Sequence, residues 1–205
     1  MVQAYFFKNM KRTFFYLLIC LMAFSACKQN KTQDSSLVFV TIEPLKYFAN
    51  EIGGDKFKVE TMVPKGGNPE TYEPTAKQMM RLSQCPIFIK VGNIGFERTW
   101  NERLHQSAPN TMFIDSSEGI SPIESSEHVD DPHTWMSCDN AIVIARHICN
   151  VFKQQKPADS TYFNQNLNRF IAKVNLTDQA IKGMLYKSST KAFLIYHPTL
   201  TYFAH

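Results

Sequence analysis

The sequence predicts an α/β fold in which a parallel sheet is covered by helices and a long helix leads into a second lobe. In the first half of the chain, short apolar runs of strand length alternate with helical segments, which is the pattern of parallel sheets. From residue 158 to about 186 apolar residues recur at helical spacing, without proline and with Gly183 as the only glycine. With 205 residues, 44% of them hydrophobic, the chain can bury a core of this kind.

Four apolar segments are expected to form the strands of a first lobe that extends over residues 37–157. The third of them, PIFIKVGN, is a continuous apolar run, as is typical of a strand that is buried on both faces. The four segments occupy residues 37–42, 56–64, 86–93 and 110–117.

The helices of this lobe are expected to lie between and after the strands. The first runs from Pro44 to the pair Gly53 and Gly54, which ends it, and the second begins near Thr75. GFERTWNERLHQSA is expected to form the third helix. CDNAIVIARHICNVFKQQ is expected to form the fourth, with Asp139 as its N-cap.

The end of the sequence predicts a connector and the start of another lobe. Residues 158–188 are expected to form a rigid connecting helix of about 40 Å, at 1.5 Å per residue. Residues 189–205 then open with a strand at 193–196 and continue into a loop. Because a single strand cannot bury both its faces alone, we expect a C-terminal lobe that is largely missing from this chain.

Residues 1–27 have the organisation of an export signal. In MKRTFFYLLICLMAFSAC, two basic residues precede an apolar run that is shorter than the roughly 20 residues needed to span a bilayer. The stretch resembles a bacterial lipoprotein signal, with Met10 as an alternative start and Cys27 as the lipidated first mature residue. Residues 28–36 form a polar tether. We therefore expect a lipid-anchored protein of the bacterial cell envelope, periplasmic or surface-facing; an N-terminal membrane helix without lipid is the alternative.

Charge and cysteine content argue against two classes of function. Of the 22 basic residues three lie in the signal, whereas none of the 18 acidic residues does, so the remainder is close to neutral and no nucleic acid is expected as a partner. Beyond the signal, Cys85, Cys138 and Cys149 are an odd and widely spaced set that indicates no disulfide framework and no Cys-x-x-Cys zinc site. Cys85 and Cys149 are expected to be buried.

Three loops carry side chains that can bind a metal ion. Glu70 follows the second strand, His133 lies beyond the fourth, and His197 follows the last expected strand. Loops at the carboxyl ends of parallel strands are where ligands gather. Imidazole and carboxylate donors suit Zn²⁺, and a set richer in oxygen suits Mn²⁺. On spacing alone, structural histidines held by hydrogen bonds are the favoured interpretation of His133 and His197.

Several longer motifs carry a resemblance to a known family. MVPKGGNPETYEPTAKQMMRL, KVGNIGFERTW, DPHTWMSCDNAIVIARHI, YFNQNLNRF and YHPTLTYFA occur in this order from about Leu37 to the last residue. The chain resembles the metal-binding lipoproteins, or solute-binding proteins, of zinc and manganese ABC importers. The resemblance implies two α/β lobes joined by a long rigid helix, with the metal between them and with His133 and His197 as ligands.

The chain departs from the family pattern at two of the four ligands. The family has a histidine in the context P-H-x-Y-x-P, whereas this chain has NPETYEP with Glu70 at that place. A carboxylate can replace the imidazole, or Glu70 can face solvent. The fourth, acidic ligand lies in the second lobe and has no equivalent here. His128 occupies the place of a histidine-rich loop and is a candidate for an extra metal contact, although a solvated loop histidine is the favoured interpretation. Asp130 and Asp131 can orient His133.

The resemblance implies a binding protein with no enzymatic activity. It is expected to be a monomer that captures Zn²⁺, or alternatively Mn²⁺, and delivers it to the permease of an ABC importer. A zinc hydrolase using His133, His197 and Glu70 around a metal-bound water is one alternative, although the sequence has no His-x-x-x-His or His-Glu-x-x-His pair. An adhesion or scaffold lipoprotein with an incidental metal site is another.

Overall fold

The computed structural model describes residues 33–124, 130–190 and 192–205. The predicted export signal with Cys27, and also His128, lie outside the described residues. Within the described ranges, no helix combines the length and the apolar composition that crossing a bilayer requires.

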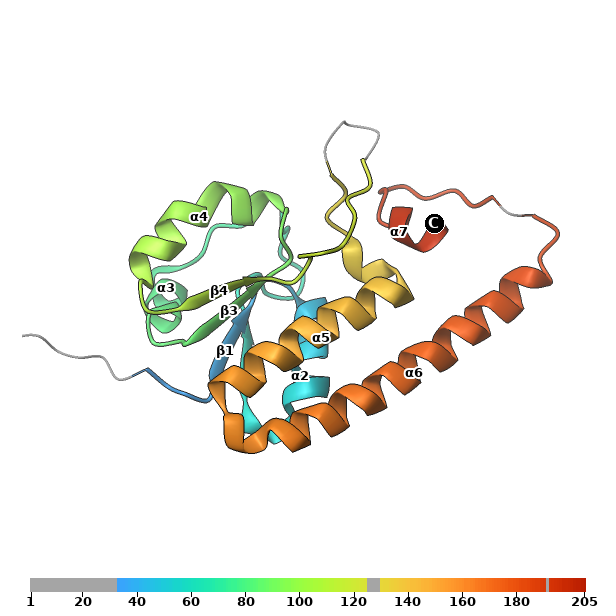
Figure 1. Cartoon of the computed structure of the whole chain (residues 1–205). Coiled ribbons are helices and arrows are strands. Elements are labelled where there is room, and N and C mark those ends of the chain that lie inside the picture. The colour runs from blue at the N-terminus through green and yellow to red at the C-terminus, as the bar shows by residue number, and fades with distance from the viewer. Residues whose placement is uncertain (1–32, 125–129, 191) are drawn as a thin grey trace, which may run out of the picture. The chain divides into compact units, whose positions relative to one another are not determined.

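A parallel sheet lies at the centre of the described residues. The strand order is β2-β1-β3-β4, and every neighbouring pair is parallel (Figure 1). The two inner strands, β1 and β3, are almost entirely buried, as expected for strands covered on both faces. The predicted α/β class is therefore confirmed. The strands are β1 (Leu37–Val40), β2 (Lys58–Thr61), β3 (Ile87–Lys90) and β4 (Met112–Asp115).

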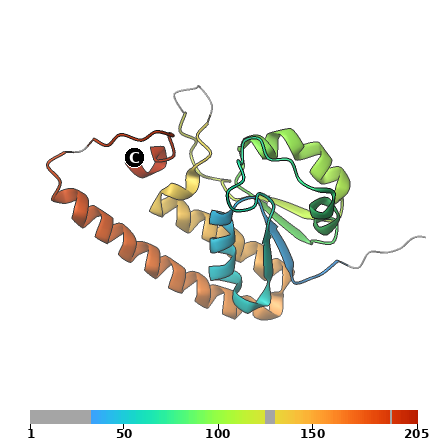
Figure 2. The ribbon, with the colours of Figure 1, turned by 180° about the vertical axis from the view of Figure 1, so that it is seen from behind.

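Helices cover both faces of this sheet. The connection from β1 to β2 moves one way across the sheet, whereas those from β2 to β3 and from β3 to β4 move the other way. Because crossovers between parallel strands are right-handed, α2 lies on one face and α3 and α4 lie on the other. Figures 1 and 2 show this arrangement, with α5 and α6 packed on the side of α2. The helices are α2 (Glu43–Gly53), α3 (Ala76–Leu82), α4 (Gly95–Ser107), α5 (Cys138–Gln155), α6 (Ser160–Tyr186) and α7 (Thr201–Ala204).

The predicted start of the second helix is confirmed, and that of α5 is corrected. The hydroxyl of Thr75 accepts a hydrogen bond from the amide of Gln78, whose side chain bonds back to the Thr75 amide, so α3 begins with a capping box. The N-cap of α5 is Ser137 rather than Asp139, because the Ser137 hydroxyl accepts a bond from the Asn140 amide. Asp139 lies in the first turn, where a carboxylate interacts favourably with the helix dipole.

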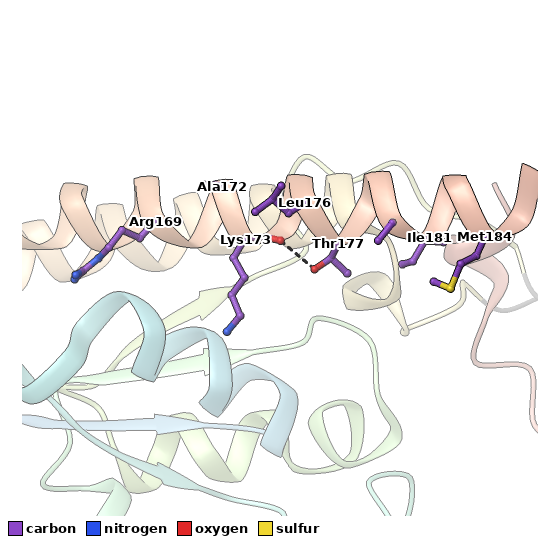
Figure 3. Close-up of a pocket in the computed structure, with 8 residues that line it drawn as sticks. Arg169, Ala172, Lys173, Leu176, Thr177, Ile181 and Met184 are labelled. Carbon is purple, nitrogen blue, oxygen red and sulfur yellow. Dashed lines mark hydrogen bonds between the residues drawn. The ribbon is translucent and has the colours of Figure 1, made fainter.

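The predicted long helix is α6, which has 27 residues and spans about 40 Å. Its first half packs against α2 and α5 through buried side chains such as Phe163 and Phe170, whereas Leu176 and Met184 in its second half are 68% and 67% exposed. Figure 3 shows side chains of this second half along the helix, including Lys173 directed toward α2. Its ammonium group donates a 2.5 Å hydrogen bond to the hydroxyl of Tyr47 on α2.

The prediction of a strand at residues 193–196 is wrong. That segment is irregular, with Leu194 and Tyr196 fully exposed, and it leads into the short helix α7. A strand needs a neighbour for its backbone hydrogen bonds, and in the described part of the chain no strand pairs with this segment.

Aromatic rings fill the core between the sheet and the helices on the side of α2. The ring of Phe57 lies 4.2 Å from that of Phe152, and both rings lie 5.8 Å from Phe163 of α6, measured between centroids. Cys85 and Cys149 are buried free thiols, as predicted. Burial raises the pKa of Cys85 to about 12, so this thiol stays protonated at neutral pH.

Candidate metal site

The imidazole of His133 is held by one carboxylate. Oδ1 of Asp131 lies 2.6 Å from Nδ1 of His133 and also accepts a 2.8 Å hydrogen bond from the His133 backbone amide. Pro132 lies between the two residues, and the turn Thr134–Met136 follows. With Nδ1 engaged, Nε2 is the ring nitrogen that remains for a ligand.

Asp131 is almost completely buried and yet is favoured in its charged form. Burial by itself would raise the pKa of Asp131, but hydrogen bonding from Thr201 and from the amide and ring of His133 outweighs it, so the pKa lies below its ordinary value. An ionised carboxylate accepts a proton-bearing Nδ1, which leaves the lone pair on Nε2 of His133. That tautomer is the one a metal ion requires.

His197 lies beside His133 although the two are far apart in the sequence. Their ring centroids are 5.4 Å apart and the ring planes are nearly perpendicular, at 80°. The indole of Trp135 lies close to the same ring, with its centroid 5.2 Å from that of His133. At this separation the ring of His197 can turn a nitrogen toward an ion that is bound by Nε2 of His133, because a histidine side chain has two rotatable bonds.

The short helix α7 fixes the segment that carries His197. Tyr202 of α7 is buried, and its hydroxyl accepts a 3.2 Å hydrogen bond from the amide of Ile123 and donates a 3.4 Å bond to the carbonyl of Ser121. Both partners belong to the segment that leads to His133. Sequence reasoning missed Tyr202, because its partners lie 79 and 81 residues away in the sequence.

Glu70 lies at the start of α4 rather than against the imidazoles. Its Oε2 accepts a 2.9 Å hydrogen bond from the amide of Gly95, the first residue of the helix, and lies 3.5 Å from Nη2 of Arg98. The residue before the helix, Ile94, has no side chain that can cap it, so Glu70 supplies the cap from a distant loop. A Cβ on Gly95 would approach Oε2 and the carbonyl oxygen of Glu70 to 2.5 Å, so only glycine permits this contact.

The structure brings two of the three predicted donors together. Within the described ranges, no group of three or more His, Cys, Asp and Glu side chains lies close enough to hold a metal ion. Glu70 is nevertheless connected to the histidine loop through its ion pair with Arg98 and two hydrogen bonds. Nη1 of Arg98 donates to the carbonyl of Asn93 at 2.6 Å, and the side-chain Nδ2 of Asn93 donates to the carbonyl of Asp130 at 3.3 Å.

A buried carboxylate, which sequence reasoning also missed, supports the loop between β3 and α4. Glu97 is 2% exposed, and its oxygens accept hydrogen bonds from the amides of Val91 and Gly92 and from the hydroxyl of Thr41. Burial raises the pKa of Glu97 even with these three donors. The bonds fix the loop that carries Asn93, and hence the side of the site that faces Asp130.

Both the sequence and the fold of the chain resemble those of known proteins. A family model described as "Zinc-uptake complex component A periplasmic" (ZnuA) matches residues 38–205. The solved "Crystal structure of ZnuA" superposes with a TM-score of 0.78 and 33% identity, covering 83% of this chain and 67% of the other.

Two curated relatives are named for different metals. The "High-affinity zinc uptake system protein ZnuA" of Bacillus subtilis is 25% identical over 93% of this chain, and the "Manganese ABC transporter substrate-binding lipoprotein PsaA" of Streptococcus pneumoniae is 27% identical over 82%. The chain spans 66% of the length of the first and 58% of the second. With a family model that covers nearly all of the described residues and a solved member one third identical, the chain belongs to the ZnuA family.

Proposed function

We propose that this protein binds a divalent transition metal, Zn²⁺ or Mn²⁺, outside the cytoplasmic membrane and delivers the metal to an ABC importer. The observation that carries the proposal is the pair His133 and His197, with His133 held by Asp131 so that Nε2 is left for a ligand. Relatives named for zinc and for manganese uptake support the same class of cargo.

The proposed ligands are Nε2 of His133, the ring of His197 and a carboxylate oxygen of Glu70. Zn²⁺ takes imidazole nitrogen and carboxylate oxygen at about 2.0–2.2 Å. Glu70 would join the imidazoles when a cation attracts it, because its side chain is 47% exposed and, among the described residues, only its Oε2 is engaged by the start of α4. Mn²⁺ would gain more than Zn²⁺ from the carboxylate, since harder cations prefer oxygen.

The same proposal covers location and partners. Cys27 would carry a lipid that anchors the protein in the cell envelope, and the permease of an ABC importer would receive the metal. The protein would act as a monomer. It would bind metal without catalysis, in line with relatives that are named as substrate-binding lipoproteins. Residues 37–157 would form the first lobe, 158–188 the connector, and 189–205 the beginning of the second lobe.

A thermal melt in the presence of metal tests the proposal. A ligand that binds only the folded state at 100 times its Kd stabilises it by about 2.7 kcal/mol, which corresponds to a rise of several degrees in Tm. We expect Zn²⁺ or Mn²⁺ to raise the Tm of the full chain, and His133→Ala or His197→Ala to remove most of this rise. His105→Ala, in an exposed position on α4, is the matched control. A Tm that neither metal changes would disprove metal capture.

A further inference from the structure

We propose that Arg98 sets the metal affinity of the site by competing with the metal for the carboxylate of Glu70. The inference rests on the proposed function and gives a role to a residue that is not itself a donor. It starts from the departure at Glu70, where the motif of the family has an imidazole and this chain has an acid.

The contacts of Arg98 fix its guanidinium beside that carboxylate. Nη1 donates hydrogen bonds to the carbonyl of Asn93 at 2.6 Å and to its side-chain oxygen at 3.2 Å. Nη2 lies 3.5 Å from Oε2 of Glu70. Because two of its nitrogens are engaged by neighbouring groups, the guanidinium is anchored at the loop between β3 and α4 instead of extending freely into solvent.

The two oxygens of Glu70 are consequently not equivalent. Oε2 is shared by the amide of Gly95 and the guanidinium of Arg98, whereas among the described residues no hydrogen bond or ion pair engages Oε1. A metal that recruits Glu70 in this state gains one oxygen. It gains the second only when Arg98 no longer holds Oε2.

Charge supports the same conclusion. Replacing a neutral imidazole with a carboxylate adds one negative charge to the site, and Arg98 returns the pair to a net charge of zero. A divalent cation that approaches Glu70 therefore meets a compensated carboxylate and a nearby positive charge. Both effects weaken metal binding. Since Glu70 and Arg98 are about half exposed, solvent screens the interaction, and the effect on Kd should be about twofold to fivefold.

The same helix supplies a matched control for the charge. The guanidinium of Arg103 lies over the ring of Trp100, 5.0 Å from its centroid, and belongs to α4 as Arg98 does. Replacing Arg103 with glutamine removes the same charge from the same helix and leaves the contacts of Glu70 in place.

Calorimetric titration of the full chain with ZnCl₂ and MnCl₂ tests the inference in a double-mutant cycle. The proteins are the unmodified chain, Arg98→Gln, Glu70→Gln, the double variant and Arg103→Gln. We expect Arg98→Gln to tighten Kd about twofold to fivefold when Glu70 is present and to leave it unchanged in the Glu70→Gln background. Arg103→Gln should bind as the unmodified chain does.

The remaining outcomes overturn the inference in different ways. Equal tightening in both backgrounds would mean that Arg98 acts as a distant charge and not through Glu70. An unchanged or weaker Kd for Arg98→Gln would show that Arg98 does not compete with the metal. If the unmodified chain binds neither metal, the proposed function fails and this inference fails with it. Circular-dichroism melts of each variant establish that the exposed substitutions leave the fold intact.

Discussion

Oδ1 of Asp131 holds His133 in two ways, because it accepts one hydrogen bond from the backbone amide of His133 and one from its ring. The backbone bond, at 2.8 Å, fixes where the residue lies, and the ring contact, at 2.6 Å, fixes how the imidazole is turned. A ligand held in this way loses little freedom when a metal binds, so more of the interaction energy contributes to affinity. The rigidity of the site therefore depends on a residue that is not among the proposed ligands.

Replacing Asp131 with asparagine should weaken metal binding about 10-fold to 100-fold. The amide nitrogen of asparagine can donate to Nδ1, which favours the tautomer with a proton on Nε2. Competition titration with a zinc chelator of known affinity measures the loss. Asp130→Asn is the matched control, because Asp130 contributes its backbone carbonyl to the bond with Asn93. Equal affinity of Asp131→Asn and the unmodified protein would contradict the orienting role.

The roles of single residues could be predicted from the sequence where their partners lie close by in the sequence. The motif DPHTW places Asp131 two positions from His133, and the structure confirms that they contact each other. Glu97 and Tyr202 could not be predicted, because their roles depend on bonds to groups such as Thr41 and Ile123 that lie 56 and 79 residues away. The position of Glu70 at the start of α4 was missed for the same reason.

Among the secondary-structure elements, α2 ends at a glycine whose missing side chain leaves room for a side chain of α6. Gly54 has φ of +54°, and a Cβ at this position would overlap the hydroxyl of Tyr162 on α6. That hydroxyl donates a 3.2 Å hydrogen bond to Asp55. The glycine therefore both ends the helix and admits α6 to the side of the lobe.

Gly54→Ala should lower the free energy of unfolding by about 2–4 kcal/mol, since it combines a left-handed backbone with a steric clash. Gly66→Ala is the matched control. Gly66 has φ of +85°, but no heavy atom of the described residues lies within 4 Å of the place that a Cβ would take, so this variant should lose only about 1 kcal/mol. Urea denaturation measures both. Equal losses would show that the contact with Tyr162 is unimportant.

The link between β2 and α3 should make stability depend on pH. Arg81 of α3 hydrogen-bonds Glu60 of β2 at 2.5 Å and lowers the pKa of that carboxyl below its ordinary 4.5. Because the folded pKa lies below the unfolded value, the stabilisation is complete above pH 4.5 and is lost as the pH falls through the folded pKa. It should amount to no more than about 1 kcal/mol, since both side chains are partly exposed.

Glu60→Gln should therefore destabilise the protein at neutral pH, and the difference from the unmodified chain should disappear in acid. Urea denaturation at a series of pH values from neutral to below pH 4.5 follows this difference. For Glu102→Gln, in an exposed position of α4, the difference in stability from the unmodified chain should stay near zero at every pH. A difference for Glu60→Gln that is constant across the series would contradict the ion-pair account.

Elements were predictable where the local pattern is sufficient. The four strands and the long helix follow from apolar runs and helical periodicity, and all are present. The strand predicted at 193–196 fails because FLIY is apolar enough for a strand, but strand formation depends on a partner that local sequence does not reveal. The N-cap of α5 was misplaced by two residues, since serine and aspartate are both favourable caps.

For the molecule as a whole, the sheet order explains where the site lies. After β1 the chain turns to one face and after β3 to the other, so a crevice is expected between the carboxyl ends of these neighbouring strands. The loop after β3 carries Asn93 and leads to Gly95, the partner of Glu70, and Asn93 in turn contacts the segment that leads to His133. Distant parts of the sequence therefore meet at the carboxyl ends of the strands.

The central claim is that His133 and His197 hold one metal ion together, and X-ray absorption spectroscopy of the zinc-loaded full chain tests it most directly. The account predicts two imidazoles at about 2.0 Å from zinc in the unmodified protein. It predicts one imidazole in either His133→Ala or His197→Ala. A zinc shell without imidazole, or one that keeps both imidazoles in each variant, would contradict it.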